Sequence, residues 1–218
     1  MILIVYVYVI SFILNVIKLY KSYKGSIYYS LFFILRDLLF LILFNCLFNV
    51  LVKIFNIRFI NVEKIVFIFI ISLLLYFVNR KYICLSFSSA VFYIVCKVLN
   101  ININFKDIAF LVGSLHIFEG VFLILSFNPK KVINLKQKMY LPLTLNSIPI
   151  IFLIFYRREK QETIYKKIIS GVIISIYGII ILLISTIVSD LILAILIVLL
   201  HESIIFVEKY LFRKIKCI

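Results

Sequence analysis

The sequence has few charged residues and no stretch polar enough for a water-facing domain. Only 15% of its 218 residues are Asp, Glu, Lys or Arg, while 65% are apolar. A soluble globular domain is about 45–50% apolar and about 25% charged, so a soluble fold is excluded. Runs such as Ile65 to Phe77 are apolar on every face, which indicates helices rather than alternating strands. We therefore predict an all-α polytopic membrane protein, because a helix satisfies its backbone polar groups internally in lipid.

Acidic residues are scarce: the sequence has 9 Asp and Glu and 24 Lys and Arg, which gives a net charge of +15. The basic residues form short clusters between apolar runs, as is typical of membrane flanks that meet anionic lipid headgroups. No basic face lies outside the predicted spans, so we expect the bilayer, and not nucleic acid, as the partner of this charge.

The usual motifs of soluble enzymes and metal proteins are also missing. The four cysteines are isolated and form no CxxC pair, so neither a disulfide nor a cysteine-based metal site is expected. His201 and Glu202 begin a pattern that would need a second histidine at position 205, which is Ile. No glycine-rich phosphate loop or nucleophile elbow occurs, and no cofactor is predicted. The four cysteines are Cys46, Cys84, Cys96 and Cys217.

The apolar runs predict a single membrane domain, residues 1–218, of about eight helices with a range of six to eight. Each run approaches the length of about 17–25 residues that a spanning helix needs. The first run lacks a basic start and a small-residue cleavage site, so we predict an uncleaved helix. The sixth contains Pro142 and Pro149, which predict a kinked helix. The predicted spans are 1–17, 26–52, 65–79, 82–96, 108–127, 140–156, 168–189 and 191–207.

Eight spans place both termini on the same side of the membrane. The connections after the second, fourth and sixth spans and the C-terminal tail carry more Lys and Arg than the other connections. The positive-inside rule therefore predicts a protein of the inner (cell) membrane with both termini in the cytoplasm. If the sixth run does not span, the two termini separate.

A few ionisable residues interrupt the apolar runs, where they are costly and point to a buried polar cluster. His116 and Glu119 share one face of a helix, and so do His201 and Glu208. Arg36 is a possible partner of Glu119 unless the second span begins after Asp37. The candidate residues of the cluster are Arg36, Asp37, His116, Glu119, His201, Glu202 and Glu208.

Three interpretations of this cluster remain open. Mutual pairing that fixes which helices meet is favoured; a proton or substrate pathway and a metal or catalytic centre are the alternatives. The metal candidates are His116, Glu119, His201 and Glu202. Small residues beside the cluster predict close helix packing. These residues are Gly113, Gly120, Gly171, Ser175 and Gly178.

Two stretches resemble a known family. Leu115-His116-Ile117-Phe118-Glu119-Gly120, with Tyr140-Leu141-Pro142-Leu143 after a basic loop, resembles the LHxxEG…FWPxPL segment of the MinJ-like PDZ-domain membrane proteins of Firmicutes. Leu200-His201-Glu202 resembles the LGHE of their last span. The likeness covers about residues 108–216; it lacks the family's glycine-rich segment, its Trp (here Leu141) and the PDZ domain.

This resemblance implies a membrane scaffold that contacts other membrane or cell-division proteins, and a non-enzymatic role is favoured. The alternative is an intramembrane metal-dependent enzyme or transporter built on His116, Glu119, His201 and Glu202. Geometry discriminates between them: two histidines within about 5–6 Å of each other, with carboxylates converging, favour metal or proton chemistry.

Overall fold

A computed structural model describes residues 27–54, 62–79, 82, 84–125, 138–145, 148–155 and 164–215, together with Ile13 and Ile17. The predicted first span, 1–17, therefore lies outside the described residues apart from these two. The chain falls into two compact units. One comprises residues 1–57 and 125–165, and the other comprises residues 58–124 and 166–218.

The first unit contains the long helix α2 (Ile27–Ile54), which matches the predicted second span closely. Arg36 and Asp37 lie inside α2, and the position along this helix at which a membrane span begins stays a prediction. Their side chains lie outside the description, so the suggested pairing of Arg36 with Glu119 stays a prediction.

The first unit also contains an antiparallel hairpin of β1 (Lys138–Leu145) and β2 (Ile148–Phe155). Leu145 pairs with Ile148, and the ladder runs to Lys138 opposite Phe155. The predicted sixth helix, 140–156, is therefore wrong. Proline is unfavourable in the interior of a helix, so Pro142 and Pro149 disfavour a helix here. Each strand of a two-stranded hairpin is an edge strand, on which proline is tolerated.

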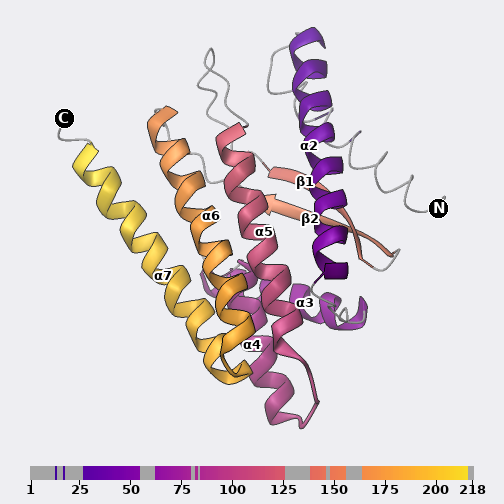
Figure 1. The fold of residues 1–218 in the computed structure, drawn as a ribbon, viewed down its shortest axis with the longest axis vertical. Coiled ribbons are helices and arrows are strands. Elements are labelled where there is room, and N and C mark those ends of the chain that lie inside the picture. Colours follow the sequence, from indigo (N-terminus) through magenta and orange to yellow (C-terminus); the bar gives the residue numbers. More distant parts are fainter. Residues whose placement is uncertain are drawn as a thin grey trace. The chain divides into compact units, whose positions relative to one another are not determined.

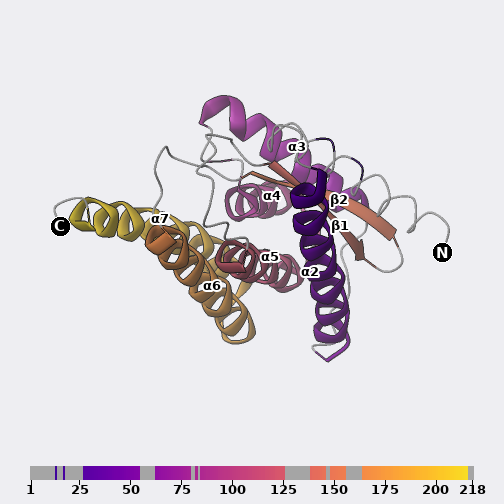
Figure 2. The ribbon, with the colours of Figure 1, turned by 90° about the horizontal axis from the view of Figure 1, so that it is seen from above.

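The second unit is helical in its described residues. The third, fourth, fifth, seventh and eighth predicted runs are confirmed as helices, with ends shifted by one to four residues except that the last helix ends eight residues later than predicted. Figures 1 and 2 show α5, α6 and α7 side by side, while α3 packs against α4. The helices are α3 (Val62–Val78), α4 (Leu85–Val98), α5 (Phe105–Leu125), α6 (Ile164–Ile187) and α7 (Asp190–Ile215).

Three of these helices are long and apolar enough to cross a bilayer: α5, α6 and α7. They indicate a membrane protein, as the composition predicts. The structure supports this coarser statement but not eight spans, because α3 and α4 are shorter apolar helices of 17 and 14 residues.

The predicted close packing of small residues is confirmed between α5 and α6. A Cβ atom placed on Gly178 would lie 2.5 Å from the carbonyl oxygen of Gly113, and one on Gly171 would lie 2.6 Å from that of Gly120. Ser175 faces Gly120 in the same seam. The two backbones are thus in direct contact, and no side chain larger than hydrogen fits between them at the glycines.

The main apolar core joins α4 to the first halves of α5 and α7 and to the second half of α6. Phe105, Ala109 and Leu193 are among its fully buried members. The backbone N–H of Phe105, at the start of α5, donates to Asp190 Oδ2 at 3.0 Å. This bond ties the starts of α5 and α7 together, because the first N–H groups of a helix have no partner within it.

Candidate metal centre

Cys84, His116 and His201 meet inside the second unit. Each offers one ligand atom, and these atoms all lie within 4.8 Å of one another. The ring centroids of His116 and His201 are 5.8 Å apart. The sequence placed both histidines in the interior of separate spans, and the fold brings them together with a cysteine from a third segment.

Cys84 is positioned by the start of α4. It occupies the N-cap of that helix, with extended backbone angles (φ −62°, ψ 138°) and no side-chain cap hydrogen bond. The amides of Phe87 and Ser88 instead bond the Cys84 carbonyl, at 3.1 and 3.3 Å. The side chain of Cys84 is therefore free of a capping role and lies toward the two histidines.

The tautomer of His116 follows from its hydrogen bonds. Its Nδ1 lies 2.7 Å from the carbonyl oxygen of Val112, one turn earlier in α5. A carbonyl only accepts, so Nδ1 carries the proton and the neutral ring presents its Nε2 lone pair. Nε2 lies 3.3 Å from Cys84 Sγ. A metal-binding histidine is typically oriented by a hydrogen bond that its other ring nitrogen donates, for example to a backbone carbonyl.

A tyrosine and a serine hold this arrangement from α6 and α4. The hydroxyl oxygen of the fully buried Tyr177 lies 2.9 Å from Ser86 Oγ and 3.0 Å from the carbonyl oxygen of Ile197, which can only accept its proton. Ser86 Oγ in turn lies 3.5 Å from both Cys84 Sγ and His116 Nε2. The Tyr177 ring packs edge-on against His116, with centroids 4.8 Å apart.

Ring contacts hold His201 from two sides. Its ring packs edge-on against Phe87, with centroids 5.1 Å apart, and against Tyr177 at 5.7 Å. Its Nδ1 atom is buried and has no hydrogen-bond partner among the described residues. A buried polar atom without a partner is costly, and it is typical of a site that binds something.

The carboxylates of the predicted cluster do not all belong to the unit that holds this centre. Glu119 interacts electrostatically with both histidines and with Glu208. Glu208 accepts a hydrogen bond from Ser170 of α6. Glu202 follows His201 directly and is half-buried, and Arg36 and Asp37 belong to the other unit.

Cys84 was not selected from the sequence, because no histidine lies near it along the chain. His116 is 32 residues away. The signal that points to Cys84 is its place just before a serine-rich helix start, Ser86, Ser88 and Ser89, all of which are buried. In an otherwise apolar chain, buried polar residues at a helix start mark a polar centre.

Comparisons of the chain with protein-family models, with curated proteins and with solved structures found no match.

Proposed function

We propose that the protein is an integral protein of the cell membrane that binds a transition metal through Cys84, His116 and His201, and that it acts as a metal-dependent enzyme or transporter. The observation that carries the proposal is the convergence of the three ligand atoms within 4.8 Å. One sulfur and two imidazole nitrogens suit Zn²⁺, and three protein ligands leave a fourth position open for water or substrate.

The donor set agrees with this assignment in two further respects. His116 has the tautomer and the carbonyl partner of a metal ligand. The Nδ1 atom of His201 is buried and has no hydrogen-bond partner among the described residues. A cysteine–histidine pair that acts as a nucleophile would use Cys84 and His116 alone. The second histidine therefore favours a metal ion over a nucleophilic cysteine.

Metal analysis of the full-length protein purified in detergent tests the proposal. We expect near-stoichiometric zinc, and Co²⁺ bound in its place should give the sulfur-to-cobalt charge-transfer absorption of a thiolate ligand. In Cys84→Ser this absorption should vanish. Metal affinity should fall by about a hundredfold or more, since loss of even an outer-shell partner costs about 10–100-fold.

Cys96→Ser is the matched control, because Cys96 is buried in the same helix, α4, away from the histidines. It should keep both the metal and the absorption. A wild-type protein without the cobalt–thiolate absorption, or equal absorption in Cys84→Ser, would contradict the metal site.

The corrected topology also supports a membrane orientation. In the sequence, the connection from α5 to α6 and the last turns of α7 are rich in Lys and Arg, whereas the other ends of these helices have Lys97, Lys106 and a lysine- and arginine-free connection between α6 and α7. The positive-inside rule then assigns the basic end, and with it the C-terminus, to the cytoplasm. In the sequence, these basic residues are Lys130, Lys131, Lys136, Lys138, Arg157, Arg158 and Lys160 between α5 and α6, Lys166 and Lys167 early in α6, and Lys209, Arg213, Lys214 and Lys216 from the last turns of α7 onward.

Cysteine labelling in intact cells checks this orientation. A membrane-impermeant maleimide should label Ser189→Cys, in the connection between α6 and α7, above the wild-type background. Glu159→Cys, between α5 and α6, should be labelled only after the cells are opened. Labelling of Glu159→Cys in intact cells would reverse the assignment.

The scaffold role implied by the MinJ-like resemblance is the second candidate, supported by the likeness of the two histidine-containing motifs. In this role, His116 and His201 hold helices together and bind no metal. Full binding of partner proteins by Cys84→Ser, together with a metal-free wild-type protein, would favour it over the metal proposal.

A further inference from the structure

The metal centre divides the second unit into two unlike halves. At about 1.5 Å per residue, His116 and His201 lie about 16 Å from the starts of α5 and α7, close to the middle of a bilayer-spanning helix. Tyr177 of the antiparallel α6 lies at the same level, because its ring contacts both histidines. Cys84 reaches this level from the start of α4, which is a half-length helix.

The half that contains α4 is closed by apolar packing. From Cys84, α4 runs toward the start of α5, where Tyr93 packs on Phe105 with ring centroids 4.9 Å apart. The core residues on α5, α6 and α7 in this half are buried and apolar; they are Phe105, Ile108, Ala109, Val112, Ile181, Leu193, Ala194 and Ile197. The buried polar side chains that the structure describes in this half are serines, among them Ser89, Ser114 and Ser185, and no carboxylate is buried among them.

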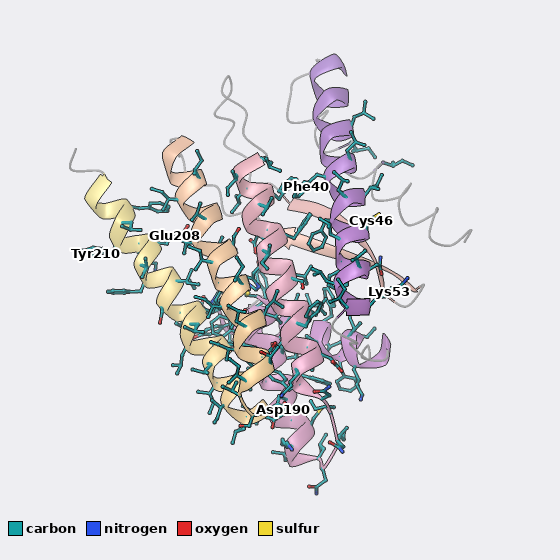
Figure 3. The ribbon with its side chains drawn as sticks, viewed as in Figure 1. Phe40, Cys46, Lys53, Asp190, Glu208 and Tyr210 are labelled. Carbon is teal, nitrogen blue, oxygen red and sulfur yellow. The ribbon has the colours of Figure 1, made fainter. Side chains whose placement is uncertain are left out.

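The other half lacks α4 and has carboxylates along its length, whereas Asp107 and Asp190 lie at the helix starts of the closed end. Glu119 lies one turn beyond His116 and interacts electrostatically with both histidines and with Glu208. Glu208 lies two turns beyond His201 and is hydrogen-bonded to Ser170. Figure 3 shows Glu208 toward the C-terminal end of α7, far from Asp190 at its start. Carboxylates at this depth are costly, and they are typical of an ion pathway.

We propose that Glu119, Glu208 and Ser170 form the route by which a divalent transition-metal cation reaches Cys84, His116 and His201, from the end where α5 finishes and α6 begins. The opposite half is the closed end of this route. The inference rests on the proposed metal site and adds the side from which that site is loaded. Oxygen ligands bind such an ion weakly enough to release it to the softer sulfur and nitrogen ligands.

The rate of Co²⁺ loading tests the route. Full-length protein in detergent is stripped of metal and mixed with Co²⁺, and the cobalt–thiolate absorption is followed with time. Glu208→Gln should load about tenfold more slowly, because negative charge along a pathway concentrates cations by about 10–10³-fold. The final absorption should match the wild type, since Glu208 is not a ligand of the bound ion.

Asp107→Asn is the matched control, because it makes the same carboxylate-to-amide change in the first turn of α5, at the closed end. It should load at the wild-type rate. Equal rates in wild type and Glu208→Gln, or equal slowing by Asp107→Asn, would overturn the route while leaving the metal site in place. No cobalt–thiolate absorption in the wild type would overturn both proposals.

Discussion

Zn²⁺ is expected to raise the thermal stability of the wild-type protein and to leave that of the double variant His116→Ala, His201→Ala unchanged. A ligand that binds only the folded state at a thousand times its dissociation constant stabilises that state by about 4 kcal/mol. The double variant retains Cys84 as the sole ligand, and a single thiolate cannot hold the ion in competition with water and buffer. The midpoint of thermal unfolding in detergent, with and without Zn²⁺, measures the difference.

The control is Ser114→Ala, which removes a buried polar group from the same helix as His116 without changing a ligand. It should keep the full Zn²⁺ response. The amount of the double variant in the membrane fraction is measured separately, because it reports whether the variant still folds. If Zn²⁺ shifts the midpoint of the double variant as much as that of wild type, the ion binds elsewhere and the proposed centre fails.

Gly178→Leu is expected to prevent α5 and α6 from packing and to lower the free energy of unfolding by about 3 kcal/mol or more. A Cβ atom at position 178 would lie 2.5 Å from the Gly113 carbonyl oxygen and 2.8 Å from the Ile117 amide nitrogen. Both atoms belong to backbone and cannot rotate away, so the helices must separate. Overpacking of a well-packed interior costs about 1–3 kcal/mol, and backbone displacement adds to that cost.

Gly178→Leu is also expected to disrupt the metal centre, because residue 178 lies beside it. Gly178 is next to Tyr177, whose ring contacts His116 and His201, so separation of α5 from α6 also displaces the tyrosine. We expect Gly178→Leu to lose both membrane accumulation and Co²⁺ binding, as measured by quantitative immunoblotting and by the cobalt–thiolate absorption. Ser203→Leu is the control, because residue 203 is exposed on α7. A Gly178→Leu protein that accumulates and melts like wild type would show that the contact of the two backbones is not required.

The sequence by itself indicated that the protein lies in lipid, and it predicted most of the helices. An apolar fraction of 65% excludes a water-facing surface, and each long apolar run in the second unit forms a helix. The glycine and serine spacing in 171–178 also predicted the seam with α5, because small residues at these intervals share one helix face. These features depend on local composition and on helical periodicity, which are visible in a linear chain.

Two features of the fold depended on more than local hydropathy. Residues 140–156 are as apolar as a span, yet two prolines and many β-branched residues place them in a hairpin. The helices α3 and α4 are also apolar but shorter, and α4 has 14 residues against 21 in α5 and 26 in α7. Length and hydropathy identify an apolar segment in the sequence. Its contacts with the rest of the chain decide whether that segment forms a membrane-spanning helix.

The metal centre shows the same division. His116, Glu119, His201 and Glu208 stand out in the sequence because ionisable groups are costly in lipid. Cys84 does not stand out, since an isolated cysteine in an apolar chain is a small hydrophobe. Its sulfur becomes a candidate ligand only because α4 starts at mid-depth beside two longer helices and faces both imidazoles. Sequence identified the residues with an energetic cost, and tertiary packing selected the partners that offset it.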